Sequence, residues 1–230
     1  MHATTGSPTA APRLRPDTVP WLAAWTGEAA IEAPLIVRPR AGGIAFADEL
    51  PTDRGVGDAL LHRGRRPARY RQGRPMFGVV HTNRQRRAMR KLLCHVCGND
   101  ADRNDLGVLW LLDNTPANCP PGWPEEELTV HPPLCLGCAA KAVRQCPELE
   151  KKGFTAVRVR DPQPYGYRGE LYVRSLDRYA SPFPILAKGT ENLAFDDPLL
   201  PWLLAAQTIL CLAGCTIVDL GAEFATGGVR

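Results

Sequence analysis

Cys94-His95-Val96-Cys97-Gly98 and Cys135-Leu136-Gly137-Cys138 decide how this chain is expected to fold. Each is a C-x2-C turn, and 37 residues lie between the two turns. Such a turn holds both thiolates on one side of a tight knuckle, and two facing knuckles supply four soft ligands for a tetrahedral metal. The spacing therefore predicts a structural zinc site made by Cys94, Cys97, Cys135 and Cys138. Because four thiolates leave no open position for water or substrate, the metal is expected to stabilise the fold rather than to catalyse.

Other roles for the paired cysteines fit the sequence less well. A redox C-x2-C motif is expected after a strand and at the start of a helix, whereas Cys94 follows Arg90-Lys91-Leu92-Leu93, which is typical of the end of a basic helix. Disulfides are disfavoured because no secretion signal precedes them, which predicts a reducing, cytoplasmic location. C-x2-C-G also occurs in iron proteins of the rubredoxin type, so iron remains the minor alternative to zinc.

Two further residues are candidates to replace one thiolate ligand. Cys119 lies in a Pro-rich loop over 116–124, and His131 lies four residues before Cys135. His95, inside the first turn, is expected to point outward. The remaining cysteines are expected to pack as small apolar side chains; they are Cys146, Cys211 and Cys215.

Charge is distributed unevenly along the 230 residues. Residues 54–91 contain twelve Arg or Lys and one acid, Asp58, whereas the other residues contain sixteen basic and twenty-three acidic groups. A concentrated basic segment in an otherwise acidic protein is typical of a polyanion partner. The alternative is a solvated basic loop that pairs with the acidic remainder of the same protein. Apolar residues are 44% of the chain, which is ordinary for a soluble globular protein.

Short elements are predicted through the first two thirds of the chain. Residues 1–17 lack any apolar period and are predicted to be a disordered tail. After it we expect a short helix from Thr18 that buries Trp21, Leu22 and Trp25, then strands over 34–37 and 43–47 and an arginine-rich loop over 54–75. A basic helix from Thr82 or Asn83 to Leu93, a strand over 107–112 and a helix over 138–146 should follow. A strand over 154–160 is expected to pair with 170–173 across a turn at 161–169.

The stretch from Leu199 to Val218 is twenty residues without a charge. Its length would allow it to span a bilayer, but Pro201, Gly214 and the absence of a basic flank argue against a membrane segment. Pro198 is typical of a helix start and Gly214 of a stop. We therefore expect a buried helix over 198–213, followed by a strand over 216–220.

A metal-dependent nuclease of the HNH type is a further hypothesis, because those enzymes often carry paired C-x2-C ligands. They need a histidine pair or Asp-His, and a later Asn and His, to build a second metal site that activates water. Between the two knuckles this chain has only His131, while His81 and Asn83 precede the first knuckle. The nuclease is therefore a weak hypothesis, and an enzyme of unidentified activity is a third class.

The chain resembles uncharacterised proteins of high-GC actinobacteria in two runs of residues. They are His81-Thr-Asn-Arg-Gln-Arg-Arg-Ala-Met-Arg-Lys-Leu-Leu-Cys-His-Val-Cys-Gly and His131-Pro-Pro-Leu-Cys-Leu-Gly-Cys-Ala. The resemblance extends from the Ala47-Asp48-Glu49 region through the second knuckle. It implies a cytoplasmic bacterial protein with a zinc-binding core, and it implies no activity.

These observations predict an α+β protein built from small mixed elements around a treble-clef or ribbon-like zinc unit, with a buried C-terminal helix. The expected divisions are the tail, an N-terminal segment over 18–80, the zinc-knuckle unit over 81–150 and a C-terminal part over 151–230, or a single domain over 18–230. The predicted function is an accessory or regulatory nucleic-acid-binding protein, and a zinc-stapled protein-interaction module with an acidic partner is the alternative. The predicted phosphate contacts are Arg84, Arg86, Arg87, Arg90 and Lys91.

Overall fold

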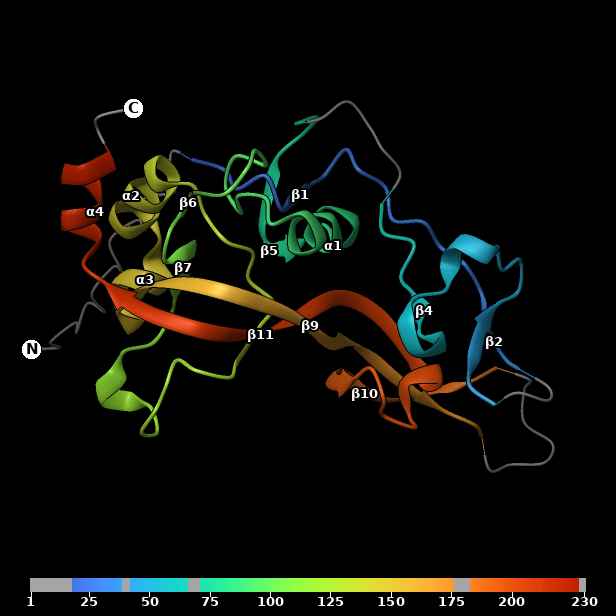
Figure 1. Cartoon of the computed structure of the whole chain (residues 1–230). Helices are drawn as coiled ribbons and strands as arrows, with labels where there is room; N and C mark the ends of the chain where they lie inside the picture. Colours follow the sequence, from blue (N-terminus) through green and yellow to red (C-terminus); the bar gives the residue numbers. More distant parts are fainter. Residues whose placement is uncertain (1–17, 39–41, 66–70, 176–182, 228–230) are drawn as a thin grey trace, which may run out of the picture.

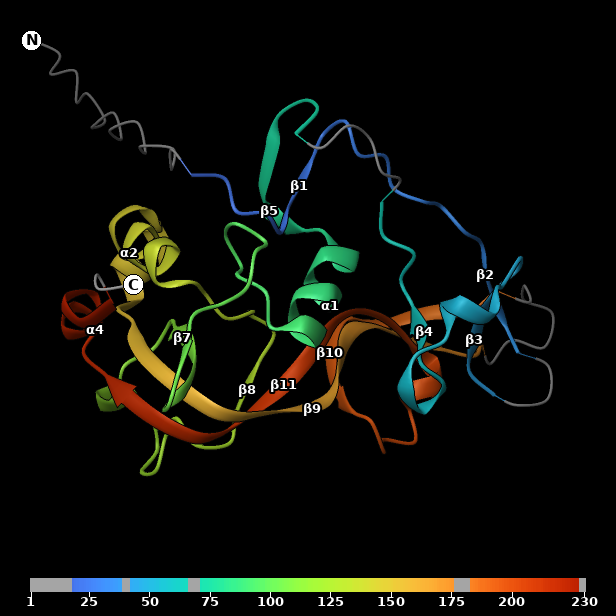
Figure 2. The ribbon, with the colours of Figure 1, turned by 45° about the horizontal axis from the view of Figure 1, so that its top comes forward.

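The structure is a computed structural model that describes residues 18–38, 42–65, 71–175 and 183–227. The predicted tail over 1–17 lies outside the described residues. Two long antiparallel strands, β9 (Thr155–Val173) and β11 (Leu203–Val218), form the backbone of the fold. They pair from Ala156 opposite Val218 to Leu171 opposite Leu203, with bulges along the way. Figures 1 and 2 show them as one curved ribbon that runs the length of the molecule.

Shorter strands add to both sides of this ribbon. β7 pairs with the first part of β9 and β10 with its last part, while β4 and β8 pair with β11. Two separate two-stranded sheets, β1–β5 and β2–β3, lie outside it. The bounds are Ala23–Trp25 for β1, Leu35–Val37 for β2, Ile44–Phe46 for β3, Leu60–Leu61 for β4, Pro75–Val80 for β5, Arg103–Asn104 for β6, Gly107–Leu112 for β7, Glu127–Thr129 for β8 and Ile185–Ala194 for β10.

The helices cover the ribbon at two places. α1 (Thr82–Lys91) lies against the middle of β11 (Figure 2). Its Met89 packs in a core with Trp110 and Val157. α2, α3 and α4 gather at the end of the ribbon near β7, over a second core that includes Leu109. Their bounds are Leu136–Gln145, Pro147–Lys152 and Leu220–Gly227. Short 3-10 turns lie at Pro51–Asp53, Val56–Asp58, Pro116–Asn118 and Leu200–Trp202.

α1 takes the place of a missing strand along one edge of β11. On that edge β4 pairs with Leu204 and Ala205, and β8 pairs with residues 210–212. Between them, side chains of α1 satisfy the backbone of β11: Arg86 donates to the carbonyl oxygens of Ala205 and Ala206, and Gln85 bonds to Thr208. Buried backbone polar groups need partners, so these two side chains fix the helix to the sheet.

Several predicted elements are confirmed. The strands expected at 34–37, 43–47 and 107–112 are present as β2, β3 and β7, and the basic helix is present as α1. The helix expected over 138–146 begins two residues earlier, at Leu136. The helix expected from Thr18 is wrong: a turn leads into β1, and Trp25 is buried as a strand residue. The loop expected over 54–75 contains β4 and the first residue of β5.

The predicted buried helix over 198–213 is wrong, because this region is the 3-10 turn Leu200–Trp202 followed by β11. An uncharged apolar run fits a buried helix and a central strand equally well when only periodicity is considered. The strand is favoured here by pairing partners on both sides, since β9 lies along one edge and β4, α1 and β8 along the other. The strand expected over 216–220 is the end of β11 and the start of α4.

The predicted turn over 161–169 is also wrong, because β9 continues through it. Pro162 and Pro164 lie opposite Leu212 and Leu210 of β11. On the other side, β7 pairs only as far as Val159, and β10 begins to pair at Gly166. The prolines therefore occupy a stretch with one unpaired edge, where a missing N–H costs no ladder bond. Residues 170–173 consequently extend the same strand rather than pairing back on 154–160.

No helix within the described ranges is long and apolar enough to cross a membrane. The described part of the chain is thus a mixed α/β fold with the paired cysteines at one end of the ribbon.

Candidate metal centre

The first knuckle is shaped by the way α1 ends. Leu92 adopts a left-handed conformation with φ 52°, which stops the helix and turns the chain toward Cys94. The Cys94 amide donates to the carbonyl of Asn99 (2.6 Å), and the Gly98 amide donates to the carbonyl of Cys94 (2.9 Å). Gly98 has φ 76°, and a Cβ there would lie 2.7 Å from the ring of Trp21. This position therefore needs glycine for both its conformation and its space.

The second knuckle is the start of α2. Cys135 is the residue that precedes the helix, and its carbonyl accepts hydrogen bonds from the amides of Cys138 (3.1 Å) and Ala139 (2.9 Å). Two backbone hydrogen bonds join the two knuckles, from His95 to the carbonyl of Pro133 (2.8 Å) and from Asp102 to that of Leu134 (2.9 Å). His95 follows Cys94 and Leu134 precedes Cys135, so these bonds hold the two cysteine pairs close together.

The four sulfur atoms lie within 4.8 Å of one another. Cys97 Sγ and Cys135 Sγ are 3.9 Å apart, close to the edge of about 3.8 Å expected for a tetrahedron with zinc–sulfur bonds of ~2.3 Å. Cys94 and Cys138 are buried, Cys135 is half-buried and Cys97 is exposed. The arrangement fits a four-coordinate metal ion whose ligands are all protein thiolates, as the spacing of the cysteines predicts.

The surroundings of the sulfurs favour the thiolate form of Cys94 and the thiol form of Cys97 and Cys138. Burial raises the pKa of the Cys94 thiol, but backbone hydrogen bonds from Cys135, Cys97 and Val96 outweigh this and leave that pKa below its usual value. Burial raises the pKa of Cys97 to about 11 and raises that of Cys138 further, with the neighbouring sulfurs contributing. A divalent cation bound to all four sulfurs would favour their thiolate forms, so metal binding would release protons.

The two alternative ligands lie outside this cluster. Neither His131 nor Cys119 belongs to the group of sulfurs that converge. The ring of His131 instead stacks on that of His95, with centroids 6.1 Å apart and planes at 19°. His95 is half-buried, so the expectation that it points outward is only partly met: it forms, with His131, one wall of a cavity beside the metal centre.

The structure divides the five predicted phosphate-binding residues into two groups. Arg84 forms an ion pair with the buried carboxylate of Glu28 and donates to the carbonyl of Ala23 (3.0 Å). Arg86 donates to backbone carbonyls of β11 and to that of His62 (2.8 Å), and burial lowers its pKa to about 10. These two arginines hold the fold together. The exposed ones are Arg87, Arg90 and Lys91.

The cavity beside the metal centre was not predicted from the sequence. Its walls come from β5, the first knuckle, the segment before the second knuckle, α2 and α3, which are far apart along the chain. Pattern analysis locates each segment separately but carries no signal that they converge. The only sequence feature that could have pointed to this cavity is the presence of two histidines, His95 and His131, close to the knuckles.

The second metal site required by an HNH-type nuclease is not found among the residues that the structure describes. Within those residues, the four cysteines are the only group of three or more Cys, His, Asp or Glu side chains placed to share an ion. Comparisons with protein-family models, with curated proteins and with solved structures find no match to this chain.

Proposed function

We propose that the four cysteines bind one zinc ion and that this ion is structural. The first knuckle, the β6–β7 hairpin and a helix that starts at the second knuckle occur in the order of a treble-clef zinc unit, with a 3-10 turn and β8 inserted before the second knuckle. Borderline-soft Zn²⁺ suits four thiolates in a tetrahedron. With all four positions taken by protein, the metal has no site for substrate, so the protein acts by binding rather than by metal-based chemistry.

The proposed partner is nucleic acid, bound through the exposed basic side of α1. Arg87, Arg90 and Lys91 have the spacing i, i+3 and i+4 that places side chains on the same side of a helix, and all three are exposed. The proposal rests on this exposed row of three cations. The helix is held at both ends, by Arg84 and Arg86 in its first turns and by the knuckle at Cys94 after it. A fixed row of cations suits phosphate contacts that position a protein without reading sequence.

The test replaces Arg87, Arg90 and Lys91 together by Ala and measures affinity for a 20-base-pair DNA and a single-stranded RNA at several salt concentrations. The slope of log affinity against log salt should fall by roughly two to three units, as expected for the loss of about three phosphate contacts. The matched control removes three exposed cations from other elements, Arg144, Lys151 and Arg174. It changes net charge equally and should leave the slope unchanged. Equal effects of the two triple variants would show that net charge, and not this helix, binds the polyanion.

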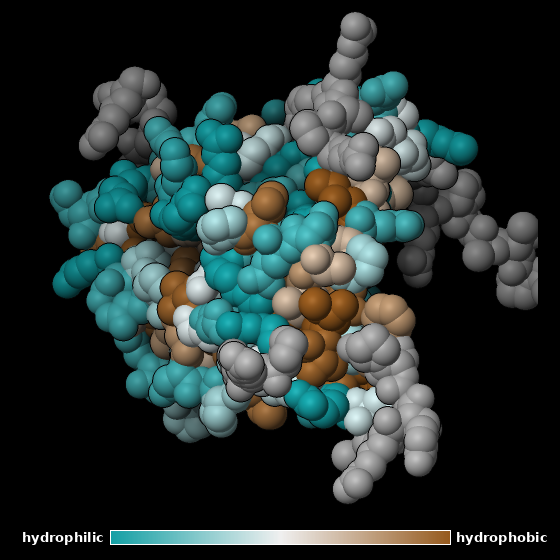
Figure 3. Space-filling model, turned by 90° about the vertical axis from the view of Figure 1, so that its right-hand side faces the viewer, coloured by the Kyte–Doolittle hydropathy of each residue, from teal (hydrophilic) through white to brown (hydrophobic). Residues whose placement is uncertain are grey.

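A protein-interaction module is the second candidate, favoured by apolar surface at the other end of the ribbon. Val173 of β9 and Ile185 and Leu186 of β10 are exposed large side chains that lie next to one another in the strand pairing. Figure 3 looks onto this end and shows apolar surface among hydrophilic residues. Exposed apolar patches of this kind mark contact surfaces. Ile185→Lys with Leu186→Ser should abolish partner binding under this alternative and leave nucleic-acid binding intact.

A further inference from the structure

The cavity next to the metal centre has a volume of about 610 Å³, within the range of roughly 300–1,000 Å³ that holds small ligands. Its floor is an open part of the second core: Leu111 and Leu134 are buried members of that core, and Leu149 packs against it. Val96, between the first two cysteines, and Leu134, just before the third, both line it. The metal centre therefore fixes two of the cavity walls.

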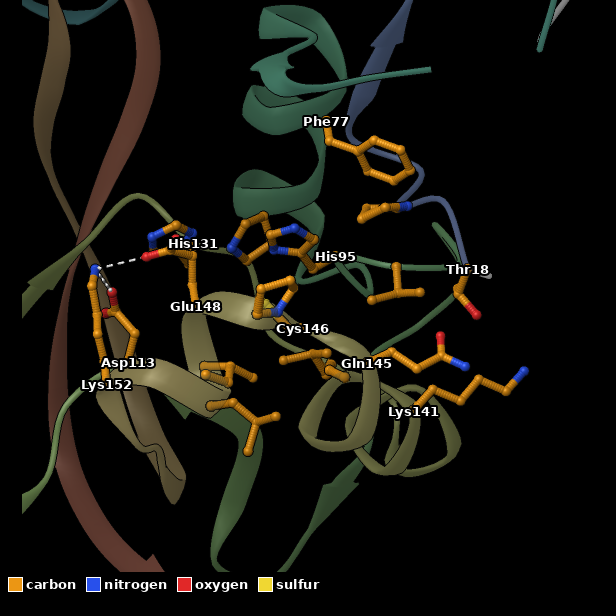
Figure 4. Close-up of a pocket in the computed structure, with 18 residues that line it drawn as sticks. Thr18, Phe77, His95, Asp113, His131, Lys141, Gln145, Cys146, Glu148 and Lys152 are labelled. Carbon is orange, nitrogen blue, oxygen red and sulfur yellow. Dashed lines mark hydrogen bonds and ion pairs between the residues drawn. The ribbon is translucent and has the colours of Figure 1, made fainter. Parts of the chain in front are cut away.

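The polar groups lie at opposite ends of this apolar floor, as Figure 4 shows. At one end Lys152 lies between two carboxylates, 3.0 Å from Asp113 and 3.6 Å from Glu148. At the other end are Lys141 and Gln145 of α2, with Thr18 beside them. The imidazole of His131 lies at the Lys152 end, and that of His95, which stacks with it, lies between the two ends.

The charges at the two ends are not equivalent. Lys152 is matched by its two acids, which gives that end one net negative charge. Lys141 is the one lysine of the cavity that has no ion-pair partner among the described residues. An anion would therefore be attracted to the Lys141 end and repelled from the Asp113 end, while an apolar body would cover the floor between them.

We propose that this cavity binds a small apolar carboxylate, with its chain over Leu111, Leu134 and Leu149 and its carboxylate beside Lys141. This site goes beyond the proposed function, because it uses neither the exposed side of α1 nor the thiolates. Burial of the chain supplies affinity in proportion to its length, and Lys141 supplies the preference for an anionic head group. The ligand class follows from the open apolar floor together with the unmatched lysine.

The proposal is tested by calorimetric titration of the full-length, metal-loaded protein with decanoate below its micelle concentration. Decanoate should bind saturably at about one site per chain, and octanoate should bind roughly 15-fold more weakly, the effect of two methylenes at ~0.8 kcal/mol each. Decanol and decylamine should bind more weakly than decanoate. Saturable binding with no dependence on chain length, or equal binding of decylamine, would overturn the assignment.

Lys141→Ala locates the head group. Both Lys141 and Arg144 are exposed on α2, but only Lys141 lines the cavity, so Arg144→Ala is the matched control. Lys141→Ala should weaken decanoate roughly two- to fivefold, as expected for an exposed ion pair, and leave decanol unchanged; Arg144→Ala should change neither. Equal behaviour of the two variants would contradict the site. Binding of the protein to anionic phospholipid vesicles without binding of free decanoate would likewise assign the surface to a membrane and overturn the proposal.

Discussion

The side chain of Gln85 hydrogen-bonds both backbone groups of Thr208, although 123 residues separate them. Its Nε2 donates to the Thr208 carbonyl (2.9 Å) and its Oε1 accepts from the Thr208 amide (2.9 Å). Nε2 also donates to the carbonyl of Val130 (2.8 Å), and Gln85 is fully buried. The Gln85 side chain thus supplies the hydrogen bonds that a neighbouring strand would make to the backbone of β11, in the gap between β4 and β8.

Gln85→Leu should strongly destabilise the protein. Leucine has a similar size but leaves one amide and two carbonyls of the backbone buried without partners, which costs on the order of 3 kcal/mol. The measurement is the free energy of unfolding by urea, with Gln163→Leu, at an exposed position of β9, as the control. A Gln85→Leu protein as stable as the parent would show that α1 is not fixed to β11 in this way.

Arg86 and Arg87 are neighbours in the sequence, but their replacement by Ala should change the free energy of unfolding by very different amounts. Arg86→Ala removes hydrogen bonds to three backbone carbonyls, of which only that of Ala205 keeps another donor, the His62 amide, and should cost roughly 2–4 kcal/mol of unfolding free energy. Arg87→Ala, at an exposed position, should change it by less than about 0.5 kcal/mol. Arg86→Lys should recover only part of the loss, because an ammonium group lacks the planar fork of a guanidinium. Equal losses for the two alanine variants would contradict the assignment of Arg86 to the interior.

Stability should fall as the pH drops below about 6.5, the pKa of an unperturbed histidine. Burial lowers the pKa of His62, Arg86 and Arg65 lower it further and Glu170 opposes them. His62 Nδ1 accepts a hydrogen bond from the Gly64 amide (2.8 Å), which requires that nitrogen to be unprotonated. Below this pH the unfolded chain binds a proton at His62 that the folded chain does not bind. The free energy of unfolding therefore falls by up to about 1.4 kcal/mol for each pH unit of acidification.

The variant His62→Asn isolates this contribution. The asparagine side-chain oxygen can accept the same amide hydrogen bond two residues on, but it does not titrate. Urea unfolding at pH 8, 7, 6 and 5.5, with metal content checked at each pH, should show a shallower loss for the variant than for the parent. Identical pH dependence in both proteins would remove His62 from the account.

The four-cysteine cluster could be predicted from the sequence because its information is local. Two C-x2-C turns determine the type and number of the candidate ligands. Gly98 sets the conformation of the first turn, and the helix start after Cys135 sets that of the second. The ribbon was not predictable in the same way, since the apolar residues 203–218 and the prolines at 162 and 164 take their structure from strands elsewhere in the chain. Likewise, nothing local distinguishes Arg86 from Arg87: the difference is made by carbonyls of β11, 119 and 120 residues away.

Cysteine substitutions should separate ligands from packing residues. Cys138→Ser should lose the metal or yield no soluble protein, because the remaining three thiolates no longer close the site. Cys211→Ser, on β11 and outside the cluster, should keep the metal content of the parent. Metal content per soluble chain is the measurement, and retention of a full complement of metal by Cys138→Ser would contradict the ligand set.

Zinc-edge X-ray absorption of the purified protein tests the central claim most directly. A structural four-thiolate site predicts about one zinc per chain with four sulfur neighbours at ~2.3 Å and no light-atom shell at 2.0–2.1 Å. A nitrogen in the first shell would replace one cysteine by a histidine and contradict the ligand set. An open position occupied by oxygen would contradict the structural role, and protein that is fully folded without metal would contradict the metal centre altogether.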